Sequence, residues 1–253
     1  MTAVSIHQPN FLPWTKLMAK IAASDVHVVY DTAQYTRSEF HARQRMKNQA
    51  GRTSWLSVPV AHTGDRQWLH EVRIDQRQNW QRGHLKHLKV HYRSTPHFDE
   101  LYALVQQVYR RAHEHLVDHN LDLMTSLCGY LELPTRIVRA SDLDAAEPED
   151  RQERLLELVR AAGGDAHLTS SGSTYEVDWS PFHRAGVPVL EQHFEHPVYA
   201  QPHGEFVPGL GVLDLLFVQG RSAVETIHAS SRFESSAAPA AASVANPQRS
   251  VLR

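Results

Sequence analysis

The stretch "IHQPNFLPW", residues 6–14, places a histidine, a glutamine and an asparagine in close succession. Histidine is the side chain whose ordinary pKa lies closest to neutrality, so His7 is a candidate general base. Gln8 and Asn10 carry amide groups that can donate hydrogen bonds to a developing oxyanion. Together they fit acyl or aminoacyl transfer from an activated donor to an amine or hydroxyl. The alternative is structural, with Asn10 capping the next helix.

A second polar segment, residues 30–47, follows the next apolar run of the chain. Asp31, at its start, is a candidate to orient His7 or to bind the acceptor. A phosphate or carboxylate of the donor needs cationic and hydrogen-bonding partners. The candidate substrate-binding residues of this segment are Gln34, Tyr35, Arg43, Arg45 and Lys47. An ordinary solvated charged surface is the alternative.

A third polar segment, "TSSGSTY", covers residues 169–175. Ser170, Ser171, Gly172 and Ser173 can offer hydroxyls and backbone N–H groups to an anion. A plain loop is the alternative. All three segments follow apolar runs that fit strands, so we expect them to meet at one edge of a parallel sheet.

The elements that must position these residues alternate between strand and helix patterns. Apolar runs and alternation predict strands over 3–6, 25–31, 54–60, 69–75, 135–143, 165–170 and 187–194. Helical spacing predicts helices over 14–24, 79–94, 97–133, 151–164, 179–186 and 211–230, and Gly163 and Gly164 predict the end of the fourth. A β-α-β beginning favours a parallel sheet. We therefore predict an α/β fold, mostly parallel and Rossmann-like, with a helical insertion.

Composition limits the class of protein. The 253 residues fit one α/β domain, residues 1–229, and the Ala-, Ser- and Pro-rich residues 230–253 are expected to be a disordered tail. A formal net charge of −2 offers no general attraction to DNA or a membrane, although tRNA stays possible as a polyanionic donor. One cysteine, Cys128, and the lack of a signal-peptide pattern predict a cytoplasmic protein that is not exported.

Eighteen histidines require a metal site to be weighed. His115 and His119 stand four apart on a predicted helix, where a solvent-facing position is the favoured interpretation. The second candidate group is His193, His196, His203 and Glu205. Spacing supplies no complete ligand set, so no metal ligand is predicted and the cofactor is left open.

The chain resembles the WbqC-like family, whose members are associated with bacterial polysaccharide, O-antigen and natural-product gene clusters. The matching segments are "IHQPNFLPW", "SDVHVVYDTAQYTRSEFHARQRMKNQAGRTSWLSVPV", "NWQRGHLKHLKVHYRSTPHFDELY", "HLTSSGSTYE" and "HPVYAQPHGEFVPGLGVLDLLFVQG". The resemblance implies an enzyme, commonly labelled as a probable transferase. For acyl or aminoacyl transfer, the expected partner is an activated small-molecule or carrier-bound donor. The positions to which it points are His7, Gln8, Pro9, Asn10, Asp31, Gln34, Tyr35, Arg43, Arg45, Lys47, Ser171, Gly172, Tyr175, Glu205 and Asp214.

Three other classes of function stay open. A weaker resemblance to nucleotidylyltransferases and pantothenate synthetase favours ATP chemistry, but their His-x-Gly-His pair is absent and fold analogy alone does not define function. A metal-dependent hydrolase would use the later histidines with Glu205 or Asp214. A noncatalytic carrier-protein or sugar-binding module would bind its partner without turnover.

Overall fold

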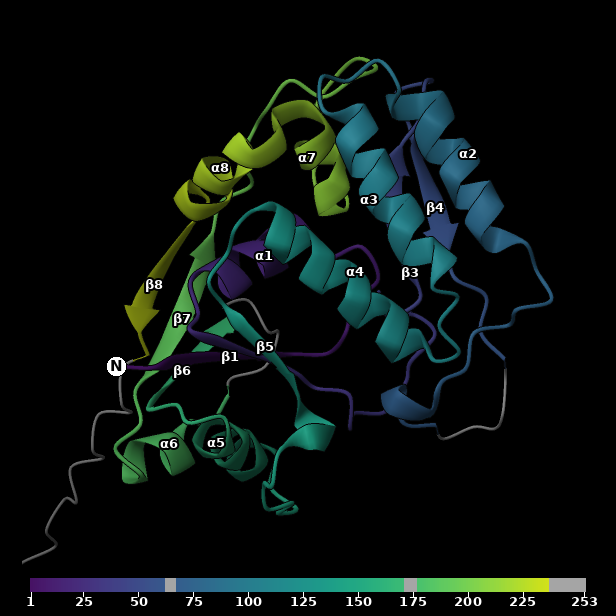
Figure 1. Cartoon of the computed structure of the whole chain (residues 1–253). Helices are drawn as coiled ribbons and strands as arrows, with labels where there is room; N and C mark the ends of the chain where they lie inside the picture. The colour runs from purple at the N-terminus through teal and green to yellow at the C-terminus, as the bar shows by residue number, and fades with distance from the viewer. Residues whose placement is uncertain (62–66, 171–176, 237–253) are drawn as a thin grey trace, which may run out of the picture.

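A mostly parallel sheet forms the centre of the protein (Figure 1). A computed structural model describes residues 1–61, 67–170 and 177–236. Within these ranges the main sheet has six strands in the order β5-β2-β1-β6-β7-β8, all parallel except β8 at the edge. They are β1 (Ala3–His7), β2 (Val26–Val29), β5 (Arg136–Arg139), β6 (Ala166–Ser170), β7 (Val189–Phe194) and β8 (Ser231–Ser235). The predicted α/β class with a mostly parallel sheet is confirmed.

Helices cover both faces of this sheet (Figure 1). α5 (Arg151–Ala161) and α6 (Ser180–Arg184) lie on one face, while α1 (Thr15–Ala22) and α8 (Ala223–Ala229) lie on the other. α5 ends as the glycine pair predicts, because Gly163 adopts a positive φ of 81° that favours glycine. The sheet is therefore enclosed in the manner of parallel α/β proteins.

A long insertion connects β2 to β5 (Figure 1). It contains the hairpin strands β3 (Arg43–Lys47) and β4 (Thr53–Ser57), the 3-10 turn η1 (Leu69–Glu71), and the helices α2 (Trp80–Tyr92), α3 (Phe98–Arg110) and α4 (Leu116–Tyr130). The helical part of the prediction is confirmed, and the stretch 97–133 forms two helices. α7 (Val212–Gln219), which reaches α8 through the 3-10 turn η3 (Gly220–Ser222), packs against α3 and so ties the insertion to the C-terminal helices.

The hairpin is absent from the sequence-based expectations, which place a strand over residues 54–60, near β4, but only a polar segment over residues 30–47. β3 pairs antiparallel with β4, so that Gln44 lies opposite Leu56. Along β3, Gln44 and Met46 are buried while Arg43 and Arg45 are partly exposed. The period-2 pattern of a strand is present, but a glutamine holds one of the inward positions and no apolar alternation is visible.

The strand expected over residues 69–75 is wrong. Its first part is the 3-10 turn η1, and its second part joins no sheet. Val72 and Ile74 are buried, as the alternation suggests, but their backbone pairs with the approach to α4. The Ile74 N–H donates to Glu114 O at 2.8 Å and the Leu116 N–H donates to Val72 O at 2.8 Å. The alternation of apolar residues here reflects the burial of Val72 and Ile74 beside α4, and it does not place the segment in a sheet.

The boundary expected at residue 230 lies too early. β8 extends the sheet over Ser231–Ser235, and its Phe233 lies opposite Gln192 of β7. Phe233 is an isolated apolar residue in a serine-rich stretch, so the composition of this segment does not predict a strand. The strand forms because its backbone pairs with β7 at the edge of the sheet. Among the described residues, no helix combines the length and the apolar character needed to cross a membrane.

Candidate functional site

His7 stands at the point where the direction of chain crossover changes. β1 is followed by α1 on one face of the sheet, and the neighbouring strand β6 is followed by α6 on the opposite face. Connections that leave adjacent strands toward opposite faces open a crevice beyond the carboxyl ends of the strands, and this is where parallel α/β proteins bind ligands. His7 is the last residue of β1, so the sheet places it at this crevice.

The alternation of β1 turns His7 toward the α1 face. Val4 and Ile6 pack into the apolar core that contains Leu156 and Phe182, on the side of α5 and α6. Ser5 and His7 alternate with them and point the other way. Ser5 bonds there to Ser24, with 2.7 Å between the two Oγ atoms. The two-residue alternation of the strand thus buries Val4 and Ile6 on one face and places the polar side chains of Ser5 and His7 on the other.

The His7 imidazole is held in a form suited to accept a proton. Its Nδ1 lies 2.8 Å from Gln8 O, and a carbonyl only accepts, so Nδ1 carries the hydrogen. Nε2 then carries the lone pair, and no described residue hydrogen-bonds to it. Burial, followed by the charge of Lys20, lowers the pKa of His7 to about 3. The ring is therefore neutral at physiological pH.

Gln8 is oriented by a histidine that the sequence analysis missed. His41 Nε2 donates to Gln8 Oε1 at 2.8 Å, which leaves the Gln8 amide N–H groups without a described acceptor. Asn120, on α4, donates from Nδ2 to His41 O at 2.8 Å and to Pro9 O at 3.3 Å. One amide therefore joins residue 9 to residue 41. The only available signal for His41 was its place in a polar segment after β2.

Asn10 and Tyr35 lie beside this arrangement. Asn10 is buried but does not cap α1, whose N-cap is Trp14 without a side-chain bond, so the capping alternative is wrong. The Tyr35 ring lies 5.7 Å from the His41 ring, centroid to centroid. Gln34 is exposed and pairs through its backbone with Trp68. The structure thus brings His7, Gln8 and Tyr35 together through His41.

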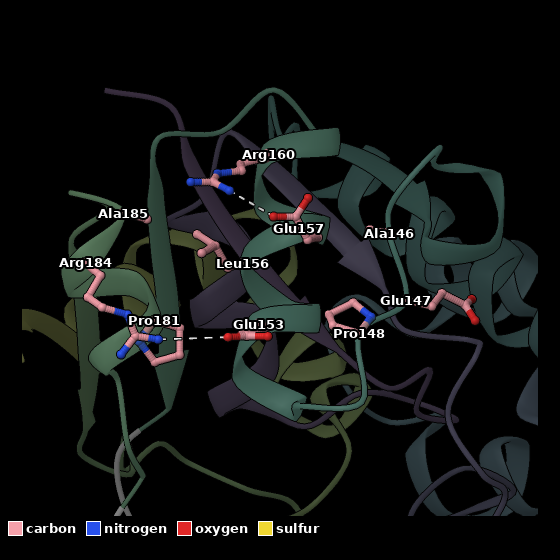
Figure 2. A pocket seen from close by; sticks show the side chains of 10 residues that line it. All are labelled: Ala146, Glu147, Pro148, Glu153, Leu156, Glu157, Arg160, Pro181, Arg184 and Ala185. Carbon is pink, nitrogen blue, oxygen red and sulfur yellow. Dashed lines mark hydrogen bonds and ion pairs between the residues drawn. The ribbon is translucent and has the colours of Figure 1, made fainter.

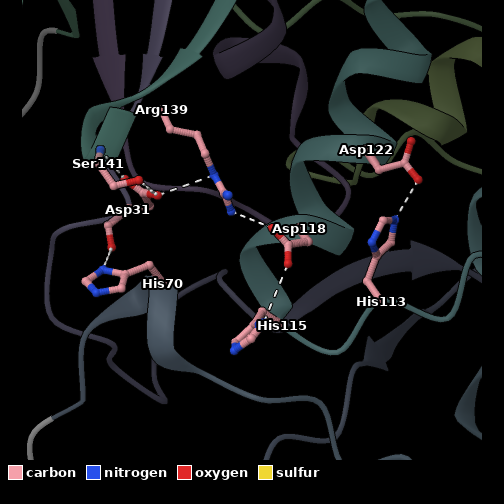
Figure 3. A network of polar contacts seen from close by, with 8 residues as sticks. All are labelled: Asp31, His70, His113, His115, Asp118, Asp122, Arg139 and Ser141. Atoms are coloured by element: carbon pink, nitrogen blue, oxygen red, sulfur yellow. Dashed lines mark hydrogen bonds and ion pairs between the residues drawn. The ribbon is translucent and has the colours of Figure 1, made fainter. Parts of the chain in front are cut away.

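Asp31 has partners other than His7 (Figure 3). Its carboxylate accepts from Ser141, through the backbone N–H at 3.0 Å and the hydroxyl at 2.7 Å. Arg139 Nε lies 3.5 Å from Asp31 Oδ2, and its Nη2 donates to Asp118 at 2.6 Å. The Asp31 side chain is fully buried. Asp31 therefore joins the ends of β2 and β5, and no described hydrogen bond connects it to His7.

The three basic residues of β3 differ in how far they are open to a ligand. Arg43 donates from Nη2 to Ser38 O at 2.6 Å and lies 4.7 Å from the Trp55 ring centroid, but its side chain stays partly exposed. Arg45 Nη2 donates to Gly209 O at 3.3 Å. Lys47 is fully buried, and its Nζ donates to Glu205 O at 2.5 Å. In this arrangement Arg43 is the residue most available to an external anion.

Asp214 is the centre of a buried polar network. Its carboxylate accepts from the hydroxyls of Tyr92 and Tyr199, each at 2.7 Å. The Tyr92 oxygen accepts in turn from the Lys47 backbone N–H at 2.8 Å. Burial raises the pKa of Asp214, and it also raises the pKa of Tyr92. Four elements or loops far apart in sequence meet there, with Glu205 exposed at the rim.

Three predicted site residues, Ser171, Gly172 and Tyr175, lie outside the described residues. A surface hollow lies elsewhere, between α5, α6 and the loop that carries Ala146, Glu147 and Pro148 (Figure 2). It is crossed by the pairs Arg160–Glu157 at 2.9 Å and Arg184–Glu153 at 3.9 Å. None of the sequence-predicted site residues lines it.

The histidine groups considered for metal binding have other surroundings. His119 is buried against Phe11 and Trp80, so its expected solvent-facing position is wrong. The Gly209 N–H donates to His196 Nε2 at 3.0 Å, and His203 Nε2 donates to His91 O at 2.5 Å. Within the described ranges, no three His, Cys, Asp or Glu side chains are grouped to hold a metal ion.

Acidification is expected to destabilise the fold through its buried histidines. Burial lowers the pKa of His41 and His84 to about 4, and of His119 and His167 to about 3. Below the ordinary pKa of 6.5 the unfolded chain binds more protons, so the free energy of unfolding falls as the pH falls. Each histidine contributes at most about 1.4 kcal/mol per pH unit.

Urea unfolding at about pH 7.5 and about pH 5 measures this effect, and we expect a lower midpoint at the acidic value. An unchanged midpoint would show that these rings titrate alike in the folded and unfolded chains.

The fold and the site define an α/β protein with a histidine at the switch point of a mostly parallel sheet. The WbqC-like protein family model matches residues 8–226, and the chain belongs to this family. It is 30% identical over 226 residues to a Mycobacterium tuberculosis protein called "Uncharacterized protein Rv1507c". That alignment covers 88% of this chain and 96% of the relative. No solved structure matches the chain.

Proposed function

We propose that this protein is a transferase that moves an acyl or aminoacyl group from an activated donor to an amine or hydroxyl, in glycan or specialised-metabolite assembly. The observation that carries the proposal is the neutral His7 ring at the switch point of the sheet, with Nε2 unbonded by any described residue. This is the form of histidine that a general base requires.

In the proposed reaction the acceptor binds beside His7 and gives its proton to Nε2 as its oxygen or nitrogen attacks the donor carbonyl. The new bond forms at the carbonyl carbon and the carbonyl electrons move onto oxygen. The amide of Gln8, whose Oε1 is already bonded to His41, supports that oxyanion through its N–H groups. Asn10 is the alternative donor. Collapse of the intermediate expels the leaving group, which takes the proton from the imidazolium.

The low pKa of His7 bears on this mechanism. A ring with a pKa of about 3 is a weak base in the unliganded protein, and the charge of Lys20 is part of the cause. A substrate that brings negative charge to this crevice offsets that charge and makes the imidazolium easier to form. The proposed donor is therefore anionic, and Arg43 is the basic residue of β3 best placed to contact it.

A thermal-shift panel tests the donor class, using wild type, Arg43→Ala and, as a matched control, the exposed Arg52→Ala. The ligands are ATP, an acyl-phosphopantetheine, a nucleotide sugar, a tRNA charged with an amino acid, and zinc. We expect the acyl-phosphopantetheine or the charged tRNA to raise the melting temperature of wild type and Arg52→Ala more than that of Arg43→Ala. Mass spectrometry of an added amine then detects transfer.

ATP-dependent nucleotidyl transfer is the second candidate, favoured by the position of His7 at a switch point, where other parallel α/β proteins bind nucleotides. Stabilisation by ATP alone would support it. Stabilisation by zinc alone would contradict acyl transfer and favour a metal-dependent hydrolase. A donor that binds without any transfer would favour a noncatalytic module.

A further inference from the structure

Lys20 is a buried cation that the proposed mechanism does not use. It lies on α1, on the side that packs against the sheet, and its side chain is only 3% exposed. Its Nζ donates to Ile6 O at 3.3 Å, one residue before His7. An ammonium has three N–H groups, and this is its one hydrogen bond to a described residue. Its amine thus lies beside the end of β1 that carries His7, and its charge acts on the His7 ring.

The titratable groups that face Lys20 from the described residues supply no negative charge. They are Lys16 from the same helix, His7 from β1, His27 from β2 and His167 from β6. Each is neutral or cationic, and no ion pair joins Lys20 to a carboxylate of the described residues. Enclosing an ammonium without a counter-charge is energetically unfavourable, so this is an unusual place for a purely structural lysine.

Chemistry offers two ways to relieve this cost. The amine can lose its proton, and burial together with the charge of Lys16 lowers the pKa of Lys20 to about 7. Alternatively an anion can bind and stabilise the protonated form. With a pKa of about 7, the Lys20 amine is only partly protonated at neutral pH. Binding of an anion raises the protonated fraction, so the protein takes up protons from solvent on binding.

We infer that Lys20 and His7 form the inner wall of an oxyanion site, which binds a carboxylate or phosphate group of the substrate by pairing it with the Lys20 ammonium. The inference rests on the proposed function for the identity of the crevice. It adds the class of ligand and a second contacting residue. It also accounts for a buried cation that has no carboxylate partner among the described residues, because the bound oxyanion would supply the counter-charge.

The test is an NMR titration with inorganic phosphate and with acetate, using wild type, Lys20→Met and Lys89→Met. Methionine keeps the length of the side chain and removes its charge, and Lys89 is an exposed lysine of α2 that serves as the control. We expect at least one anion to bind wild type and Lys89→Met, and to bind Lys20→Met at least about tenfold more weakly. Binding of acetate indicates a carboxylate ligand, and binding of inorganic phosphate indicates a phosphate ligand. Equal affinity in all three proteins, or no binding to wild type, would overturn the inference.

A second measurement uses wild type alone, so it stands even where Lys20→Met fails to fold. Carbon-13 labelling of lysine Cε follows the protonation of each Nζ. We expect Lys20 to titrate below the other lysines, and its pKa to rise when the binding anion is added. A Lys20 pKa that does not respond to either anion contradicts the site.

The anion-binding measurements need no turnover, so together with the turnover of His7→Ala they test the two proposals separately. If Lys20→Met loses anion binding while His7→Ala keeps full turnover, the oxyanion site is supported and the role of His7 as a base is contradicted. If Lys20→Met binds anions like wild type while His7→Ala loses turnover, the base is supported and the oxyanion site is contradicted.

Discussion

Replacing His7 with alanine is expected to lower turnover at least about 100-fold while the melting temperature stays nearly unchanged. The ring is the proposed proton acceptor, and its Nε2 bonds to no described residue. The substitution therefore removes a chemical group and, among the described residues, one side-chain hydrogen bond, that to Gln8 O. Transfer from the donor identified by the thermal-shift panel supplies the rate, and calorimetry supplies the melting temperature.

His228→Ala is the matched control, because His228 is exposed on α8, away from the crevice. It is expected to retain wild-type turnover. His7→Gln tests whether the loss comes from the base, since glutamine keeps a polar side chain but cannot accept the proton. Near wild-type turnover in either His7 variant would remove the residue from the mechanism.

Replacing Asp214 with alanine is expected to lower the free energy of unfolding by about 3 kcal/mol. The carboxylate accepts from the hydroxyls of Tyr92 and Tyr199, and both would lose a buried acceptor. Tyr92 also bonds to the backbone of Lys47, so the change is expected to loosen β3 against α7. Urea unfolding measures the difference from wild type.

Asp99→Ala is the control for Asp214, since Asp99 is an exposed carboxylate in the first turn of α3. Asp99→Ala is expected to lower the free energy of unfolding far less than Asp214→Ala does. Asp214→Asn keeps an acceptor oxygen and is expected to fall between the two. The resemblance to the WbqC-like family points to Asp214 as a substrate-binding residue. An Asp214→Ala protein with unchanged stability and weaker donor binding would support that role over the structural one.

The position of His7 could be predicted from the sequence because the relevant signals are local. The apolar run of β1, the helical spacing of α1 and the apolar run of β2 each depend on neighbouring residues, and together they define a β-α-β unit. A polar residue at the carboxyl end of the first strand then falls at the ligand-binding edge by the geometry of parallel sheets.

The partners of the predicted site residues could not be found in the same way. Asp31 bonds to Ser141, which lies 110 residues further along the chain, because β5 happens to pair with β2. His41 reaches Gln8 only because the hairpin folds back over the end of β1. Periodicity predicts which elements form, and it does not predict which elements become neighbours.

The sequence by itself therefore determined the α/β class, most helices and the histidine motif at the end of β1, since those follow from local periodicity and chain geometry. The tertiary structure alone decided which charged side chains are enclosed. Nothing in the sequence marks Lys47 or Lys20 as buried. Packing against the 201–211 loop encloses Lys47, and packing against the sheet encloses Lys20. Burial is a property of what covers a residue, and distant segments of the chain supply that cover.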